Sequence, residues 1–195
     1  MIDFSAHRFH PVVRLPEQFD VLDLTGRSGV APMRTSEFSI GRYDEDRRGV
    51  YTQALFEGSR TIHMGIDIGA PAGTLIYAPH AGRIWCTGCN TAAGDYGPTL
   101  ITVHELDDQR LWILYGHLGR EVLARWSPGM EFVAGARLAE IGAETENGGW
   151  PPHLHLQLSL IEPDGCDLPG VVSGSERESA LIKFPDPRLI LGPIY

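Results

Sequence analysis

Cysteine is scarce in this chain of 195 residues, and long apolar runs are missing. Cys86, Cys89 and Cys166 are an odd number and too few for a disulfide framework, which favours a reducing compartment. No segment is apolar enough over a sufficient length to span a membrane. The first ten residues also lack the basic stretch and apolar run of a secretory leader. We therefore expect a cytoplasmic protein.

Basic clusters and several catalytic signatures are also missing. With 25 acidic and 16 basic residues the formal charge is −9, so nucleic acid is not an expected partner. There is no H-E-x-x-H zinc helix and no G-x-S-x-G elbow. Cys86 and Cys89 have C-x-x-C spacing, but no second pair and no βαβ pattern accompany them. We interpret this segment as a strand end running into a turn.

Glycine and proline, 23 and 14 residues, divide the chain into short apolar stretches that suit strands better than helices. The pattern predicts a mainly β protein with few short helices. Residues 106–109 predict a hairpin and hence an antiparallel pair. The strand signals cover residues 61–68, 75–78, 82–86, 99–105, 111–118 and 153–161.

The length and the 43% hydrophobic content favour a single domain. We expect residues 1–58 to be an N-terminal extension that packs on the core rather than catalyses. Residues 59–162 would form the β domain, and residues 163–195 a C-terminal tail that completes it. One or two helical turns are expected between Ser175 and Lys183.

The segment from Ile62 to Ile68 alternates strictly between apolar and other residues. On a strand, His63 and Asp67 therefore share one face, and Gly65 between them leaves room for an ion that both could reach. An ordinary amphipathic strand would show the same pattern. This segment alone does not decide between the two.

A second strict alternation runs from His153 to Leu160, with four leucines on one face. His153 and His155 lie on the other face, about 7 Å apart. At this spacing one histidine can bind a metal ion while its neighbour acts on the water bound to that ion. The run from Leu111 to Leu118 adds His117, which we expect on the same strand face as Tyr115.

Two imidazoles and one carboxylate are a donor set typical of catalytic zinc, which keeps one position open for water. The complex stays cationic and lowers the pKa of its water toward about 7. A nearby imidazole then takes up a proton and passes it to the leaving amine. His117 and His153 suit that work.

Taken in order, the motifs HMGID, YGHL and HLH resemble the lysostaphin-like zinc endopeptidases, which cleave peptide cross-links in bacterial cell walls. The resemblance covers about residues 60–160 and includes the glycine-punctuated stretches IDIGAPAGTLIYAPHAGRI and GMEFVAGARLAEIGA. It implies that His63, Asp67 and His155 bind one zinc ion and that His117 and His153 are catalytic. The implied fold is an antiparallel β structure of two sheets, with the metal on the floor of a groove.

Three features depart from that family. No export signal is visible, the stretch before HLH reads ENGGWPP, and the upstream tyrosine of the family has no clear counterpart. Tyr51 and Arg60 are candidates to stabilise an oxyanion, although ordinary structural roles fit them as well. Trp150 either lines a substrate groove or packs on the sheet.

Three functions follow from these patterns. The first is a zinc endopeptidase acting on peptidoglycan-type peptides through a metal-activated water. The second is a non-catalytic metal-binding regulatory module, although a module released from catalysis could have lost any of the five polar residues. The third is a cytoplasmic zinc amidohydrolase acting on a small amide, a possibility that the missing leader leaves open.

Overall fold

The computed structural model describes residues 2–27, 34–51, 54–56 and 59–195. The strands are β1 (Asp20–Val21), β2 (Ser39–Gly41), β3 (Glu45–Asp46), β4 (Arg60–His63), β5 (Ile66–Gly69), β6 (Leu75–Tyr77), β7 (Gly82–Asn90), β8 (Gly97–Leu106), β9 (Gln109–Gly116), β10 (Glu131–Phe132), β11 (Arg137–Glu140), β12 (His153–Ser159) and β13 (Val171–Ser173). The helices are η1 (Phe4–Ala6), η2 (Ala54–Phe56), α1 (Val122–Arg125), α2 (Arg177–Lys183) and α3 (Arg188–Leu191).

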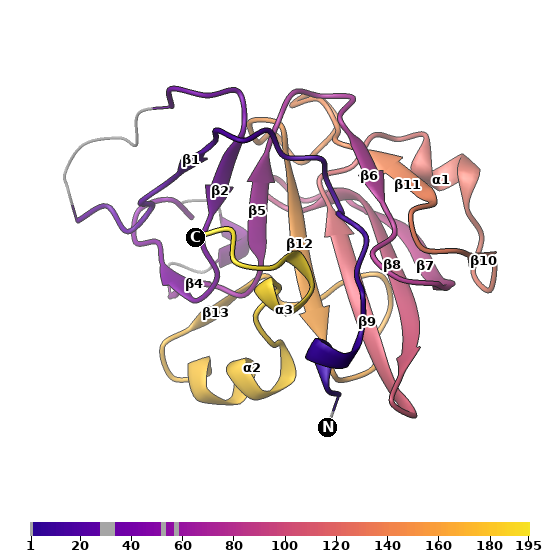
Figure 1. Cartoon of the computed structure of the whole chain (residues 1–195). Helices are drawn as coiled ribbons and strands as arrows, with labels where there is room; N and C mark the ends of the chain where they lie inside the picture. The colour runs from indigo at the N-terminus through magenta and orange to yellow at the C-terminus, as the bar shows by residue number, and fades with distance from the viewer. Residues whose placement is uncertain (1, 28–33, 52–53, 57–58) are drawn as a thin grey trace.

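The strands form one large sheet and two small ones (Figure 1). The large sheet has the order β1-β2-β5-β12-β9-β8-β7-β10, and the small sheets are β11-β6 and β13-β4-β3. Strand pairs are antiparallel except β1 with β2. The prediction of a mainly β, largely antiparallel protein with few short helices is confirmed.

The large sheet is apolar on both faces, because its strands alternate between two hydrophobic clusters. On β9, Ile113 and Tyr115 belong to the first cluster, whereas Trp112 and Leu114 belong to the second. The predicted hairpin joins β8 and β9 through Asp107 and Asp108, whose φ angles are 50° and 58°. Two successive left-handed residues match the twist of the flanking strands.

The segment predicted as one strand over residues 61–68 is two strands in different sheets. β4 ends at His63 and β5 begins at Ile66, so the chain crosses from the three-stranded sheet to the large one at Met64 and Gly65. Met64 accordingly belongs to the second cluster and Ile66 to the first. The crossing places the end of β4, in the three-stranded sheet, beside the start of β5, in the large sheet, so both strands contribute to one site.

A second correction concerns the C-x-x-C segment, which lies inside β7 rather than at a strand end. The strand runs on to Asn90 because residues 86–90 continue the ladder with β8.

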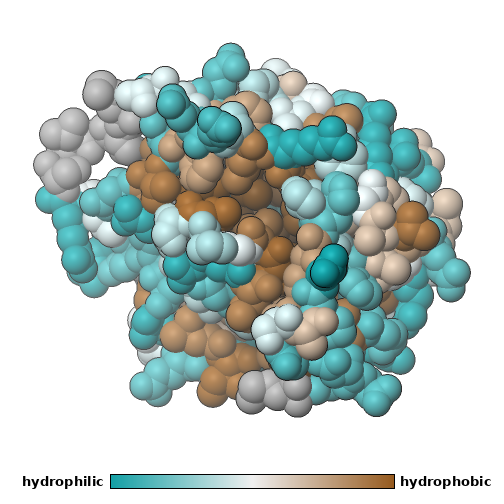
Figure 2. Space-filling model, viewed as in Figure 1, coloured by the Kyte–Doolittle hydropathy of each residue, from teal (hydrophilic) through white to brown (hydrophobic). Residues whose placement is uncertain are grey.

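The two ends of the chain cover one face of the large sheet (Figure 1). The N-terminal segment starts at η1, which contacts α3, runs up in front of β9 and crosses the upper ends of β12 and β5. Val12, Val13 and Ile190 contribute to the first cluster. In Figure 2, apolar side chains gather near the middle of this face and polar ones surround them. Among the described residues, no helix is long and apolar enough to cross a membrane.

Candidate metal centre

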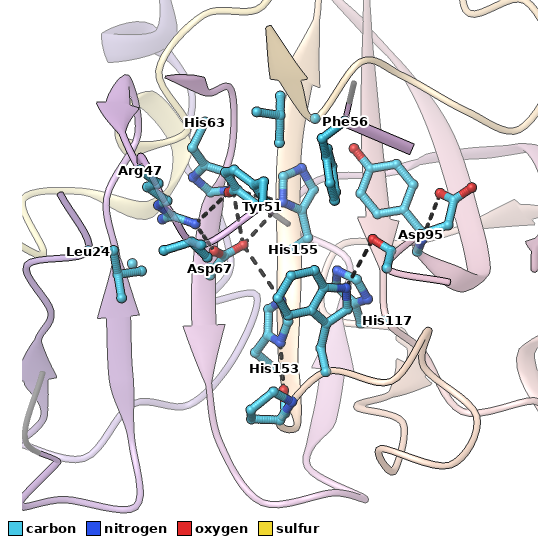
Figure 3. Close-up of a pocket in the computed structure, with 18 of the residues that line it drawn as sticks. Leu24, Arg47, Tyr51, Phe56, His63, Asp67, Asp95, His117, His153 and His155 are labelled. Carbon is cyan, nitrogen blue, oxygen red and sulfur yellow. Dashed lines mark hydrogen bonds and ion pairs between the residues drawn. The ribbon is translucent and has the colours of Figure 1, made fainter. Parts of the chain in front are cut away.

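Three strands bring the predicted metal ligands together on the floor of a cavity (Figure 3). His63 ends β4, Asp67 lies in β5, and His155 lies in β12 directly opposite Asp67 in the register. Gly65 provides the room, since a Cβ there would lie 2.5 Å from Cε1 of His155. The space that we expected above Gly65 is therefore taken up by the imidazole ring of His155.

Each of the two imidazoles has one nitrogen that points away from Asp67, and the contact of that outer nitrogen determines where the ring's lone pair lies. Nδ1 of His63 is 2.9 Å from the carbonyl oxygen of Arg42, which only accepts, so the neutral ring carries its hydrogen on Nδ1. Nε2 of His155 likewise lies 3.1 Å from Oε1 of Gln157. The amide nitrogen of Gln157 donates to Pro169, which supports this orientation of the amide.

The inner atoms Nε2 of His63, Nδ1 of His155 and Oδ1 of Asp67 lie 3.0 to 3.1 Å from one another. By the assignment above, each presents a lone pair and none a hydrogen. Three acceptors at this spacing repel one another unless a cation lies among them. These residues also form the group that could hold a metal ion in the described part of the chain.

The charge states of the group agree with this arrangement. Burial, followed by the charge of Arg47, lowers the pKa of His63 to about 4, so its ring is neutral at pH 7. Burial would raise the pKa of Asp67, but attraction to His63 and Arg47 outweighs it and holds that pKa well below its usual range. At neutral pH the group thus offers a neutral imidazole and a carboxylate, the protonation states that metal binding requires.

His117 reaches the cavity through a backbone conformation that strand alternation does not predict. β9 ends at Gly116, and His117 has a φ of 63°. Without this left-handed residue, His117 would share the core face of Tyr115, as we expected. The two side chains instead separate, so that Tyr115 is fully buried in the first cluster and His117 lines the cavity.

His117 and His153 form a pair beside His63, Asp67 and His155, the three residues called the metal group below. Their ring centroids are 4.3 Å apart, and Nε2 of His153 lies 3.9 Å from Oδ1 of Asp67. Nδ1 donates to the carbonyl of Asn147 in His117 and to that of Pro151 in His153, each at 2.7 Å. Both Nε2 atoms therefore carry lone pairs. Burial lowers the pKa of both rings, and His153 lowers that of His117 further.

The N-terminal extension supplies a second layer around the metal group. Arg47 is buried and donates to Oδ2 of Asp67 at 2.6 Å and to Glu45 at 2.9 Å. Oδ1 of Asp67 stays directed toward the imidazoles of His63 and His155. Gly41 makes this pairing possible, since a Cβ there would lie 2.8 Å from Nη2 of Arg47. No pattern in the sequence distinguished Arg47 from its charged neighbours.

The two oxyanion candidates lie in different settings. The hydroxyl of Tyr51 accepts from Arg47 at 3.0 Å, and Tyr51 lies over the metal group in Figure 3. Burial raises the pKa of Tyr51, which keeps its hydroxyl protonated. Arg60 lines the cavity but donates to the carbonyl of Leu55. Trp150 lines the cavity, and its Nε1 donates at 3.0 Å to the carbonyl oxygen of Gly94 in the loop between β7 and β8.

Tyr96 is a site residue that sequence reasoning missed. Its ring lies beside those of both His155 and His117, with centroid distances of 5.1 and 5.6 Å. A Cβ at Gly116 or at Gly170 would clash with it. Tyr96 follows a Gly-Asp turn, and only this pattern of surrounding glycines could have suggested a ring held closely between two segments.

These groups line a cavity of about 320 Å³. Its polar floor carries the histidines and Asp67, and much of its wall is apolar. The apolar residues of the wall include Leu22, Leu24, Val50, Leu55, Phe56 and Val171.

The family model of peptidase family M23 matches residues 61–164, which is more than half of the chain. The chain belongs to peptidase family M23. It is therefore a hydrolase of the peptidase class, from a family of metallopeptidases. The resemblance noted from the three motifs is confirmed.

Among solved structures, this M23 peptidase is similar to a mutant catalytic domain of the prophage-encoded M23 protein EnpA from Enterococcus faecalis. The identity is 25% and the TM-score 0.47, over 72% of this chain and 94% of that one. A zinc-containing peptidase from Vibrio cholerae is 20% identical with a TM-score of 0.49, over 78% and 36%. The catalytic domain of lysostaphin from Staphylococcus simulans is 18% identical with a TM-score of 0.45, over 73% and 92%. Among curated proteins, none matches.

Proposed function

We propose that this M23 peptidase is a zinc-dependent endopeptidase with one zinc ion held by His63, Asp67 and His155. The observation that carries the proposal is the convergence of two imidazole nitrogens and one carboxylate oxygen at 3.0 to 3.1 Å from one another. The contacts of the other ring nitrogens assign the ring hydrogens away from this point. A tetrahedral zinc ion with bonds of about 2.0–2.2 Å holds its ligand atoms about 3.3 Å apart, close to this spacing. Two imidazoles and one carboxylate are also a ligand set typical of catalytic zinc.

Bound there, zinc would polarise the scissile carbonyl and lower the pKa of a water toward about 7. His117 and His153 are the proposed catalytic histidines. Each has its hydrogen committed to a backbone carbonyl and a free lone pair on Nε2. One of these atoms accepts the proton of the attacking water, and the protonated imidazole then delivers it to the leaving amine.

Tyr51 is the better placed of the two oxyanion candidates. Arg47 donates to its oxygen, which leaves the phenolic hydrogen available for the charge that develops on the carbonyl oxygen. The apolar wall beside the polar floor suits a peptide whose side chains pack while its backbone lies over the histidines. Peptidoglycan-type peptides are the substrates that we propose.

Elemental analysis of the purified protein, followed by hydrolysis assays, tests this proposal. We expect about one zinc per chain, loss of metal in His63→Ala, and retained metal with at least about a hundredfold lower kcat in His153→Ala. His80→Ala is the matched control, since His80 is a partly buried histidine outside the cavity lining. If His63→Ala keeps both metal and activity, the assigned site is wrong.

The choice of substrate separates the remaining alternatives. The wild type and His153→Ala are assayed on cell-wall peptides and on small amides. Cleavage of cell-wall peptides supports the endopeptidase, and cleavage of small amides alone would favour an amidohydrolase. Stoichiometric zinc without hydrolysis of either class would favour a metal-binding module.

A further inference from the structure

Two of the three cysteines, far apart in the sequence, meet outside the metal centre. Cys86 lies in β7, and Cys166 lies in the loop of residues 160–170 between β12 and β13. Sγ of Cys166 is 3.7 Å from the carbonyl oxygen of Thr99, the residue of β8 that pairs with Gly88 of β7. Sγ of Cys86 is 3.5 Å from the carbonyl oxygen of Gly165, the residue before Cys166. The side chain of Cys86 thus contacts the backbone of the loop directly before Cys166.

The loop is seated on β7 at this point. A Cβ at Gly88 would lie 2.9 Å from Cβ of Cys166, so the absence of a side chain at Gly88 permits the approach. The amide of Asn90 donates to the carbonyl oxygen of Cys166 at 3.0 Å. Cys86, Gly88 and Asn90 alternate along β7 and face the loop together, whereas Cys89 is out of phase and points to the other face.

We propose that Cys86 and Cys166 are an oxidisable pair that forms an intramolecular disulfide by exchange with a low-molecular-weight disulfide. The thiolate of one cysteine attacks the oxidant, forms a mixed disulfide and releases one thiol. The second cysteine loses its proton, attacks the protein sulfur of the mixed disulfide and releases the second thiol. Two protein thiols are oxidised, and one small disulfide is reduced to two thiols.

The neighbouring thiol of Cys86, followed by burial, raises the pKa of the Cys166 thiol, so Cys166 is protonated at neutral pH until the exchange draws its proton away.

The bond would fasten one wall of the cavity to the large sheet. Directly after Cys166, residues 167–170 line the cavity, and the carbonyl oxygen of Leu168 accepts from the hydroxyl of Tyr96 at 3.0 Å. Gly170 accepts from the backbone nitrogen of Met64 at 2.8 Å, next to His63. Because the loop already has these contacts, closing the bond requires little rearrangement and mainly restricts the unfolded chain.

The test is incubation of the folded chain with oxidised glutathione, followed by intact mass and peptide mapping. We expect the loss of two hydrogen masses, a cross-linked peptide pair containing Cys86 and Cys166, and a Tm that rises by about 5–10 °C and returns on addition of dithiothreitol. Cys86→Ser and Cys166→Ser should abolish both effects. Cys89→Ala is the matched control and should keep them.

A stable glutathione adduct without the cross-link, or a cross-link that involves Cys89, would overturn the proposal. So would a Cys86–Cys166 bond that leaves Tm unchanged or lower, because it would have formed at the expense of the native loop contacts. None of these readouts depends on metal or hydrolysis, so the proposed function can fail while this inference stands.

Discussion

At His63 and His155, the contact of one ring nitrogen decides what the other nitrogen can do. A backbone carbonyl and an amide oxygen take up the hydrogens, and the lone pairs are left to converge with Asp67. Arg47 acts similarly on the carboxylate, since it engages Oδ2 and leaves Oδ1 facing the imidazoles. Residues around a metal site commonly set its affinity in this way.

Replacing Arg47 with glutamine should weaken zinc binding about 10- to 100-fold, because Asp67 loses the donor that orients it. Competition with a chromophoric chelator measures the affinity, and urea unfolding of the metal-free protein measures stability separately. Arg48→Gln is the control, since Arg48 is exposed and pairs only with Asp46 among the described residues. Unchanged affinity with reduced stability would mean that Arg47 has a structural role alone.

His104 should make stability depend on pH away from the metal group. Its Nδ1 donates to Ala81 and its Nε2 accepts from Thr102, and burial lowers its pKa to about 4. The folded state therefore binds the proton less readily than the unfolded chain, whose pKa is near 6.5. The stabilisation is present above pH 6.5 and is lost as the pH falls toward 4.

Between pH 7 and pH 5 the expected loss is about 2 kcal/mol. Urea unfolding with a chelator present, for the wild type and for His104→Gln, isolates this contribution from that of His63. If both proteins lose the same stability over this range, the assignment to His104 is incorrect.

At the scale of the strands, the site depends on the interruption between β4 and β5. The turn at Met64 and Gly65 lets β4 and β5 enter different sheets, while β12 pairs with β5 and β9. Strand alternation predicted which residues of β5 and β12 share a face. It did not predict the interruption, because one continuous strand over residues 61–68 would bury the same apolar residues as β4 and β5 do.

Gly65→Ala should displace the ring of His155 and lower zinc affinity more than about tenfold, since the new Cβ would meet that ring and the carbonyl oxygen of Leu156 at 2.8 Å or less. We expect a destabilisation of about 1–3 kcal/mol from overpacking. Titration with zinc and urea unfolding measure the two effects. Gly174→Ala is the control, because its Cβ meets nothing within 4 Å, and equal behaviour of the two variants would refute the packing argument.

For the whole molecule, the N-terminal extension is part of both the sheet and the site. β2 extends the large sheet beside β5, and Val12, Val13 and Ile40 lie in the first cluster. The domain boundaries at residues 59 and 162 remain predictions. The cytoplasmic location inferred from composition also stays a prediction.

A chain beginning at residue 59 should fail to fold cooperatively. It would expose the edge of β5 and the apolar face that residues such as Val12, Val13 and Ile40 cover, and it would lack Arg47. Thermal melting followed by circular dichroism, with and without zinc, measures this. A sharp transition at a Tm similar to that of the full chain would show that the extension is dispensable.

The sequence by itself determined what depends on neighbouring residues along one strand. Strand geometry places His63 and Ile62 on opposite faces, and likewise His155 and Leu154. The hairpin at residues 106–109 also follows from local backbone geometry. The resemblance of the motifs then indicated the donor set and the family.

Only the tertiary structure decided the contributions that come from distant segments. Arg47, Tyr96 and the approach of the loop at Cys166 to Cys86 depend on segments that no periodicity describes. His117 enters the site because a single left-handed residue reverses the face on which its side chain lies. Such contacts are selected by packing of the whole chain, whereas local patterns are selected by the geometry of one strand.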